Sequence, residues 1–240
     1  MNIKTLLITF LTLTACGDST NSDIETGNLT EFKSTEVTVT DSATSDNYIC
    51  GNDIYEPGEE CDDNDDLKCI QCNSPRRIFI NSTIQFDALD IKYENLDEMC
   101  TELAVLNSFY NKFTWKAWIS KTDLSIKDNL YNSPGYYTSL SGSIVAYSFT
   151  DLTDGTLNNA LIYDQDGMEQ LDKDVWTGTY WDGSFAYENC DNWSNIRAFG
   201  LMGRTNTMEK DWTSVGELAL CSEKKFIYCI EDEYIVDNQY

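Results

Sequence analysis

The chain has 240 residues, enough for one folded domain with smaller attachments. It carries 41 Asp and Glu against 16 Lys and Arg, so its formal net charge is −25. Such a surface repels phosphate backbones and anionic headgroups, which argues against nucleic acid and heparin-like polyanions as partners. The chain has no histidine, so it lacks the usual base for a Ser or Cys nucleophile. We therefore expect no catalytic residues and a protein that is not an enzyme.

Residues 1–15 have the pattern of a signal peptide. A positive charge at Lys4 precedes an apolar stretch that is shorter than the roughly 20 residues of a membrane span. The tetrapeptide Leu13-Thr14-Ala15-Cys16 resembles the lipobox of bacterial lipoproteins. The resemblance implies lipidation of Cys16 and attachment to a membrane through this N-terminal lipid. With Gly17 next, it implies an exported protein of the cell envelope, at the outer membrane of a Gram-negative bacterium.

Residues 16–47 are predicted to form a flexible stalk. From Gly17 to Asn47, 12 of 31 residues are Ser or Thr, and large apolar side chains are few. Such a segment cannot bury enough apolar surface to offset the entropy of ordering it.

The nine cysteines divide cleanly once Cys16 is assigned to lipid. The remaining eight form two groups of four, which are Cys50, Cys61, Cys69 and Cys72, and Cys100, Cys190, Cys221 and Cys229. Two modules, each held by its own disulfides, would give this pattern, and export to an oxidising compartment favours disulfides over metal thiolates. A zinc ribbon is the alternative for the first group, but only Cys69 and Cys72 have the spacing that it needs.

Residues 48–74 are too short and too polar to fold without such bonds. Cys50-Gly51-Asn52 and the run Glu-Pro-Gly-Glu-Glu-Cys-Asp-Asp at positions 56–63 resemble the cysteine-rich repeat of myxobacterial surface proteins. The segment departs from that repeat at Asp53, where the family usually has glycine. The resemblance implies a spacer or contact module, and the pairing of its four cysteines stays open.

Two acidic runs could suggest a metal. Calcium is the one cofactor that the sequence suggests, because the hard oxygens of Asp62, Asp63, Asp65 and Asp66 suit it, although the EF-hand spacing is missing. The second run, from Asp164 to Asp174, is expected to be a solvated loop.

Residues 75–240 show the pattern of a globular domain. Strands are predicted at Ile78–Ile80, residues 115–119, 175–178 and 226–230, and a short helix near residues 123–130. A longer helix is predicted with Asn95 or Asp97 as its cap. Its apolar residues recur at helical spacing and are Leu96, Met99, Cys100, Leu103 and Ala104. Few helices, short strands and long loops indicate an α+β domain.

The order of motifs in this domain is similar to the endostatin-like branch of the C-type lectin-like fold and to a related family of uncharacterised bacterial lipoprotein domains. The motifs are Cys100 on a helix, Trp-Lys-Ala-Trp-Ile-Ser at 115–120, Ser-Phe-Thr-Asp-Leu at 148–152, Val-Trp-Thr-Gly at 175–178 followed by Asp182-Gly183, Cys-Asp-Asn-Trp at 190–193, and Cys221 before Ile-Tyr-Cys-Ile-Glu at 227–231. The resemblance implies a C-type lectin-like fold with nested disulfides, Cys100 with Cys229 and Cys190 with Cys221. The zinc-binding histidines and arginine patch of endostatin and the calcium-binding triplets of sugar-binding lectins are not found in this sequence.

Among the six tryptophans, Trp181 differs from the rest. Trp115, Trp118, Trp176 and Trp193 fall on strand or core motifs, so we expect them to be buried. Tyr180-Trp181-Asp182 reads as a turn after a strand, with aromatic side chains free to contact a ligand.

Three functions remain in order of preference. The first is a membrane-anchored binding or adhesion module, surface-exposed or periplasm-facing, whose lectin-like head contacts a glycan or another surface protein. The second is a structural envelope protein that makes only protein contacts. The third, a carboxylate-dependent glycan hydrolase, rests only on the abundance of acidic residues.

Overall fold

The computed structural model describes residues 49–52, 54, 56, 59–62, 69, 72–107, 113–133 and 135–235. The predicted signal peptide, the stalk and Cys16 lie outside these residues, so their boundaries stay predictions. Within the described ranges, no helix is both long enough and apolar enough to cross a membrane.

A single mixed sheet of eight strands organises the chain from Arg76 onward, which confirms the mixed α/β class in its coarse form. The strands are β1 (Arg76–Phe86), β2 (Phe113–Ala117), β3 (Tyr137–Ser139), β4 (Ile144–Ala146), β5 (Asp174–Trp176), β6 (Phe199–Arg204), β7 (Leu218–Leu220) and β8 (Lys225–Tyr234). Their order across the sheet is β4-β3-β1-β8-β5-β6-β7, with β2 paired to β8 outside this path.

The sheet forks at β8. One edge of β8 pairs antiparallel with β1, and the other edge pairs with β2 near the end of β8 and with β5 near its start. After β2 ends, the Trp118 amide still donates to the Tyr228 carbonyl at 2.9 Å, and the Ser120 amide then donates to Thr177 beyond β5, also at 2.9 Å. The chain thus crosses from one branch of the fork to the other within three residues.

Both faces of the central strands are buried, and alternate residues of β8 serve the two cores. Ile227 and Cys229 belong to one core, while Tyr228 and Ile230 belong to the other. This explains why the C-terminal strand reads as an apolar run rather than as an alternation.

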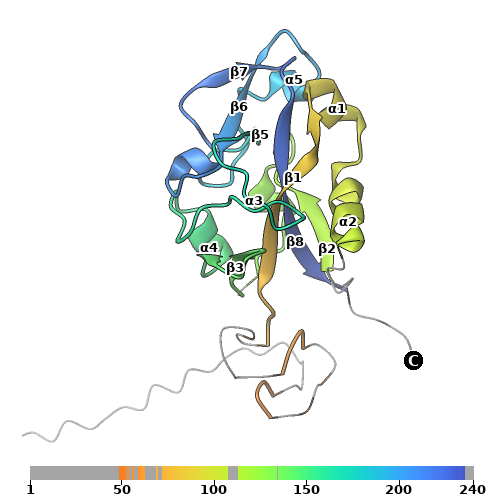
Figure 1. Ribbon diagram of the computed structural model, residues 1–240, viewed down its shortest axis with the longest axis vertical. Coiled ribbons are helices and arrows are strands. Elements are labelled where there is room, and N and C mark those ends of the chain that lie inside the picture. The colour runs from red at the N-terminus through yellow and green to blue at the C-terminus, as the bar shows by residue number, and fades with distance from the viewer. Residues whose placement is uncertain are drawn as a thin grey trace, which may run out of the picture. The chain divides into compact units, whose positions relative to one another are not determined.

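Helices cover one face and irregular segments the other. On the first face lie α1 (Ala88–Tyr93) and α2 (Leu96–Leu106), which Figure 1 shows together on one side of β1 and β8. The short turns α3 (Ile126–Asn129), α4 (Phe149–Leu152) and the 3-10 helix η1 (Lys210–Trp212) belong to segments of the second core, and α5 (Cys190–Trp193) joins the first.

The two first helices begin at side-chain caps. The Asp87 carboxylate accepts from the Leu89 and Asp90 amides. The Asp90 carboxylate in turn accepts from the Asp87 amide, which completes a capping box. The sequence did not predict α1. For α2 the cap is Asn95, the first of the two predicted residues, which accepts from the Glu98 amide.

Three disulfides are present among the described cysteines. Cys100 of α2 bonds Cys229 of β8, and Cys190 of α5 bonds Cys221 after β7, the pairs that the resemblance implies. All four of these cysteines are fully buried. In the N-terminal group, Cys61 bonds Cys69.

A buried arginine joins the N-terminal module to the sheet. The Arg76 guanidinium is fully buried, and its Nη1 and Nη2 atoms each donate to the Glu60 carboxylate at 2.6 Å. Its Nε donates to the Asp232 carbonyl at 2.7 Å, and its Cζ lies 4.3 Å from the centre of the Phe113 ring. Glu60 belongs to the predicted cysteine-rich repeat and Arg76 opens β1, so this ion pair fixes the two segments together.

Replacing Arg76 by Met should destabilise the protein strongly, because it leaves the Glu60 carboxylate without its charged partner in a buried site. We expect a loss of about 3–5 kcal/mol of unfolding free energy, measured by urea denaturation. The matched control is Arg204→Met, since Arg204 pairs with Asp174 but is 42% exposed, and here the loss should stay below about 1 kcal/mol. Equal effects of the two substitutions would contradict the role given to Arg76.

Candidate functional site

The predicted ligand turn lies at the tip of a short hairpin that follows β5. The Tyr180 amide donates to the Ser184 carbonyl at 2.8 Å and the Gly183 amide to the Tyr180 carbonyl at 2.9 Å. Gly183 has a φ of 76°, which favours glycine in the turn. This geometry presents Trp181 outward, and its side chain is 44% exposed, as the sequence predicts.

The other tryptophans are buried. Trp115, Trp118, Trp176 and Trp193 all lie in the two cores, which confirms the prediction for each, and Trp212 is buried as well. Trp181 is thus the one tryptophan of the six that presents its ring to solvent.

Trp181 lines an open hollow of about 390 Å³. Three segments distant in sequence form it, and its lining residues are Asp154, Gly155, Trp181, Glu209, Lys210 and Asp211. One tryptophan, three acidic residues and one lysine therefore line a single concave surface.

The segments around the hollow are fixed to one another and to the core. The Leu157 amide donates to the Met208 carbonyl at 2.6 Å, and Thr156 and Glu209 form an antiparallel bridge. Trp212, next to Asp211, packs its ring 4.9 Å from that of Trp118 and 5.8 Å from that of Tyr228. One side of the hollow is therefore anchored in the second core.

Gly155 supports the exposed ring. Its φ is 97°, and a Cβ placed there would lie 3.3 Å from Cε3 of Trp181. The indole thus lies so close to Gly155 that an added Cβ would require the ring to shift by a few tenths of an ångström.

The neighbours of Trp181 have different roles. The Tyr180 hydroxyl donates to the Glu188 carboxylate at 3.0 Å, and burial together with this carboxylate raises the pKa of Tyr180. Asp182 accepts from the Ser184 amide and hydroxyl. Burial alone would raise the pKa of Asp182, but the Ser184 hydrogen bonds and the charge of Lys127 outweigh it and lower this pKa. Tyr180 and Asp182 therefore shape the turn, and Trp181 alone of the three lines the hollow.

Of the four predicted calcium residues, the structure describes one, Asp62. Asp62 accepts from the Gly51 amide at 2.9 Å and from the Asn52 amide at 3.2 Å, so it holds the backbone of the repeat. Asp63, Asp65 and Asp66 lie outside the described residues. In the part of the chain that the structure describes, no three Cys, Asp or Glu side chains converge as metal ligands would. Calcium at this run stays a prediction.

The second acidic run is not uniformly solvated, and for Asp164 the expectation was wrong. Asp164 is 3% exposed and accepts from the Ser82 hydroxyl, the Gln170 amide group and the Asp166 and Met168 backbone amides. Four donors satisfy its buried carboxylate, so it organises the loop from within. Spacing along the sequence could not show this, because Ser82 comes from β1.

Comparisons with protein-family models and with curated proteins find no match to this chain. The site must therefore be judged on its own geometry.

The residues that line the hollow combine one aromatic residue with three acidic residues and one lysine. An exposed indole offers a flat apolar face, and carboxylates accept hydrogen bonds from hydroxyl groups. The sequence pattern indicates Trp181 but not the other residues that line the hollow. Asp154, Glu209 and Asp211 carry no motif, and their segments are brought together by the Thr156–Glu209 bridge and the Leu157–Met208 hydrogen bond.

Substitution of Gly155 tests the support of the ring. Gly155→Ala adds a Cβ against Trp181, whereas Gly142→Ala adds one at a similar φ of 82° with no atom within 4 Å. Both should cost about 1–2 kcal/mol through backbone strain. Only Gly155→Ala should increase the oxidation of Trp181 in hydroxyl-radical footprinting, because only there is the ring displaced. An equal increase in both variants would show that Gly155 does not support the indole.

Proposed function

We propose that this protein is a non-catalytic binding protein of the bacterial cell envelope, anchored through a lipid on Cys16, whose folded domain binds a neutral glycan in the hollow at Trp181. The observation that carries the proposal is the exposed Trp181 ring beside Asp154, Glu209 and Asp211 in one open concavity. Binding sites of this kind combine an apolar surface with a few polar groups that fix orientation.

The C-type lectin-like, endostatin-like fold and the myxobacterial type of cysteine-rich repeat are part of the proposal. Their support is the motif order along the sequence together with two disulfides of which one lies inside the other, Cys190–Cys221 within Cys100–Cys229. The calcium-binding triplets of sugar-binding lectins are missing from the sequence, so the proposed mode of binding is stacking and hydrogen bonding without a metal.

Removal of the exposed ring tests the glycan site. Trp181→Ala should weaken binding of a glycan, first identified on an array, about fivefold, because ring contacts of this kind contribute on the order of 1 kcal/mol. Trp181→Phe should retain part of the affinity. Tyr187→Ala is the matched control, since Tyr187 is an aromatic residue that is 81% exposed and does not line the hollow. Unchanged affinity in Trp181→Ala, or no glycan bound by the wild type, would reject the proposal.

The anchor has its own test. Cys16→Ser removes the thiol that would carry the lipid, so the protein should lose incorporation of labelled palmitate and leave the membrane fraction. Cys50→Ser, which keeps Cys16, is the control and should stay in the membrane fraction. Membrane retention of the Cys16→Ser chain would contradict lipid anchoring and leave the glycan proposal intact.

One observation favours the alternative, a structural envelope protein that makes only protein contacts. Phe199 of β6 pairs with Leu220 of β7, and these side chains, with Leu218, are 56%, 37% and 46% exposed. β7 is also the last strand of the sheet. Exposed apolar side chains at a sheet edge are typical of protein contacts. A failed glycan test would make this the preferred function.

A further inference from the structure

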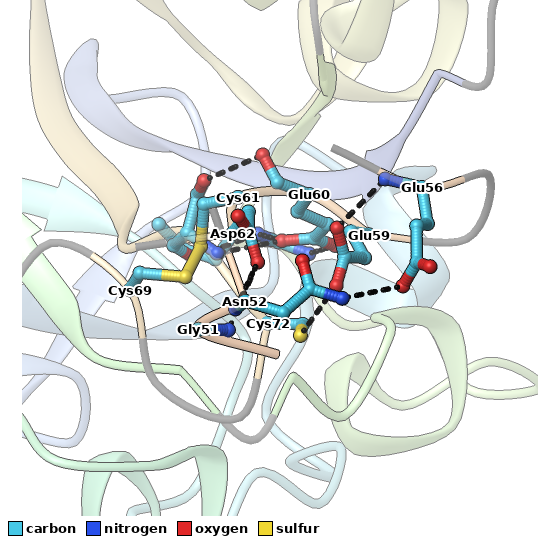
Figure 2. The surroundings of a disulfide bond; sticks show 11 residues. Gly51, Asn52, Glu56, Glu59, Glu60, Cys61, Asp62, Cys69 and Cys72 are labelled. Carbon is cyan, nitrogen blue, oxygen red and sulfur yellow. Dashed lines mark hydrogen bonds and ion pairs between the residues drawn. A yellow bond between two sulfur atoms is a disulfide. The ribbon is translucent and has the colours of Figure 1, made fainter. Parts of the chain in front are cut away.

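Two cysteines of the repeat, Cys50 and Cys72, belong to none of the three disulfides of the structure. The Cys50 side chain is nevertheless close enough to Cys72 to raise the pKa of its thiol. Cys72 is buried, and Figure 2 shows its sulfur directed at Glu59, to which it donates at 3.2 Å.

The backbone of the repeat holds both cysteines in place. The Glu60 amide donates to the Cys72 carbonyl at 3.0 Å. On the other side, Asp62 accepts from the amides of Gly51 and Asn52, which directly follow Cys50. The segment from Glu60 to Asp62 is therefore hydrogen-bonded both to Cys72 and to the two residues that follow Cys50.

We propose that Cys50 and Cys72 form a fourth disulfide in the exported protein. Two S–H bonds break and one S–S bond forms, and the two protons released end on the two thiols of the reduced oxidant. The two electrons pass to a disulfide oxidant, either a thiol–disulfide oxidoreductase or glutathione disulfide, which is reduced to two thiols. Since Cys61–Cys69 lies between these positions in the sequence, the repeat would contain two nested bonds, as the larger domain does.

The surroundings favour a disulfide over a thiolate site. Burial, Cys50 and Glu59 all raise the pKa of Cys72, so its thiolate is disfavoured. Metal binding and thiol catalysis both need that thiolate. Because no neighbour among the described residues stabilises the Cys72 thiolate, the reduced form gains no stability and the disulfide is harder to reduce. This is typical of a structural disulfide rather than of a redox switch.

The bond would change how the chain transmits tension, and this consequence rests on the proposed anchor. A pull on the stalk would enter at Cys50 and pass through the disulfide to Cys72, four residues before the buried Arg76. The residues between the two cysteines would then carry no load.

Peptide mapping of alkylated, unreduced protein tests the pairing. Full-length chain with Cys61→Ala and Cys69→Ala keeps Cys50 and Cys72, and cleavage after Lys, Arg and Glu, which spares the Glu56-Pro57 bond, places them on peptides 37–59 and 69–76. We expect these peptides to be linked, with a mass two hydrogens below their sum. The matched control is Cys61→Ala with Cys72→Ala, which keeps Cys50 and Cys69 on the same two peptides and should leave both as alkylated thiols.

Each variant is prepared from cell envelopes and also by refolding the reduced chain with glutathione disulfide. Linkage after refolding but not in the envelope sample would support the pairing and contradict export. Alkylated Cys50 and Cys72 in the refolded sample, zinc released by a chelator, or equal linkage in the control would each overturn the pairing. None of these results depends on glycan binding, so the two proposals can fail separately.

Discussion

The arrangement of the whole domain depends on the pairing of β8 with three strands. β1 occupies one edge of β8, and β2 and β5 share the other, so the chain must be nearly complete before the centre of the sheet can form. The Cys100–Cys229 bond then ties this central strand to α2 across 129 positions of sequence. A disulfide that closes so long a loop lowers the entropy of the unfolded chain more than one that closes a short loop. In the chain-entropy model it stabilises the folded state by about 5 kcal/mol.

The fork also explains how the hollow at Trp181 is built from loops. Trp118 leaves β2 at the fork and enters the second core, where it packs against Trp212, the residue after Asp211. The Ser120 carbonyl beyond it accepts from the Trp193 indole, and the hairpin that carries Trp181 begins just after β5. Functional loops held by a rigid sheet are a common arrangement, and here the fork supplies two separate points of attachment.

The spacing of apolar residues along the sequence predicted α2 and the central strands, whose formation depends mainly on neighbouring residues. Helical spacing placed Cys100 on the buried side of α2, and the central strands were found from apolar runs. The turn at residues 190–193 could not be predicted, because Cys190, Asp191, Asn192 and Trp193 all have φ between 53° and 61°, a conformation that costs non-glycine residues about 1–2 kcal/mol each. The Cys190–Cys221 bond and the hydrogen bond of Trp193 to Ser120 offset that cost, and both join segments distant in sequence. The companions of Trp181 in the hollow were missed for the same reason.

The net charge of −25 says less about a ligand than the groups in the hollow do. At physiological salt, charges separated by more than about 8 Å are largely screened. A bound glycan would therefore interact chiefly with Asp154, Glu209, Asp211 and Lys210, three negative charges against one positive. This balance disfavours sulfated and carboxylated sugars, although one oxygen of Asp154 already accepts from the amide and hydroxyl of Thr156. The proposed selectivity for neutral glycans thus rests on the same residues that would bind them rather than on the acidic surface elsewhere.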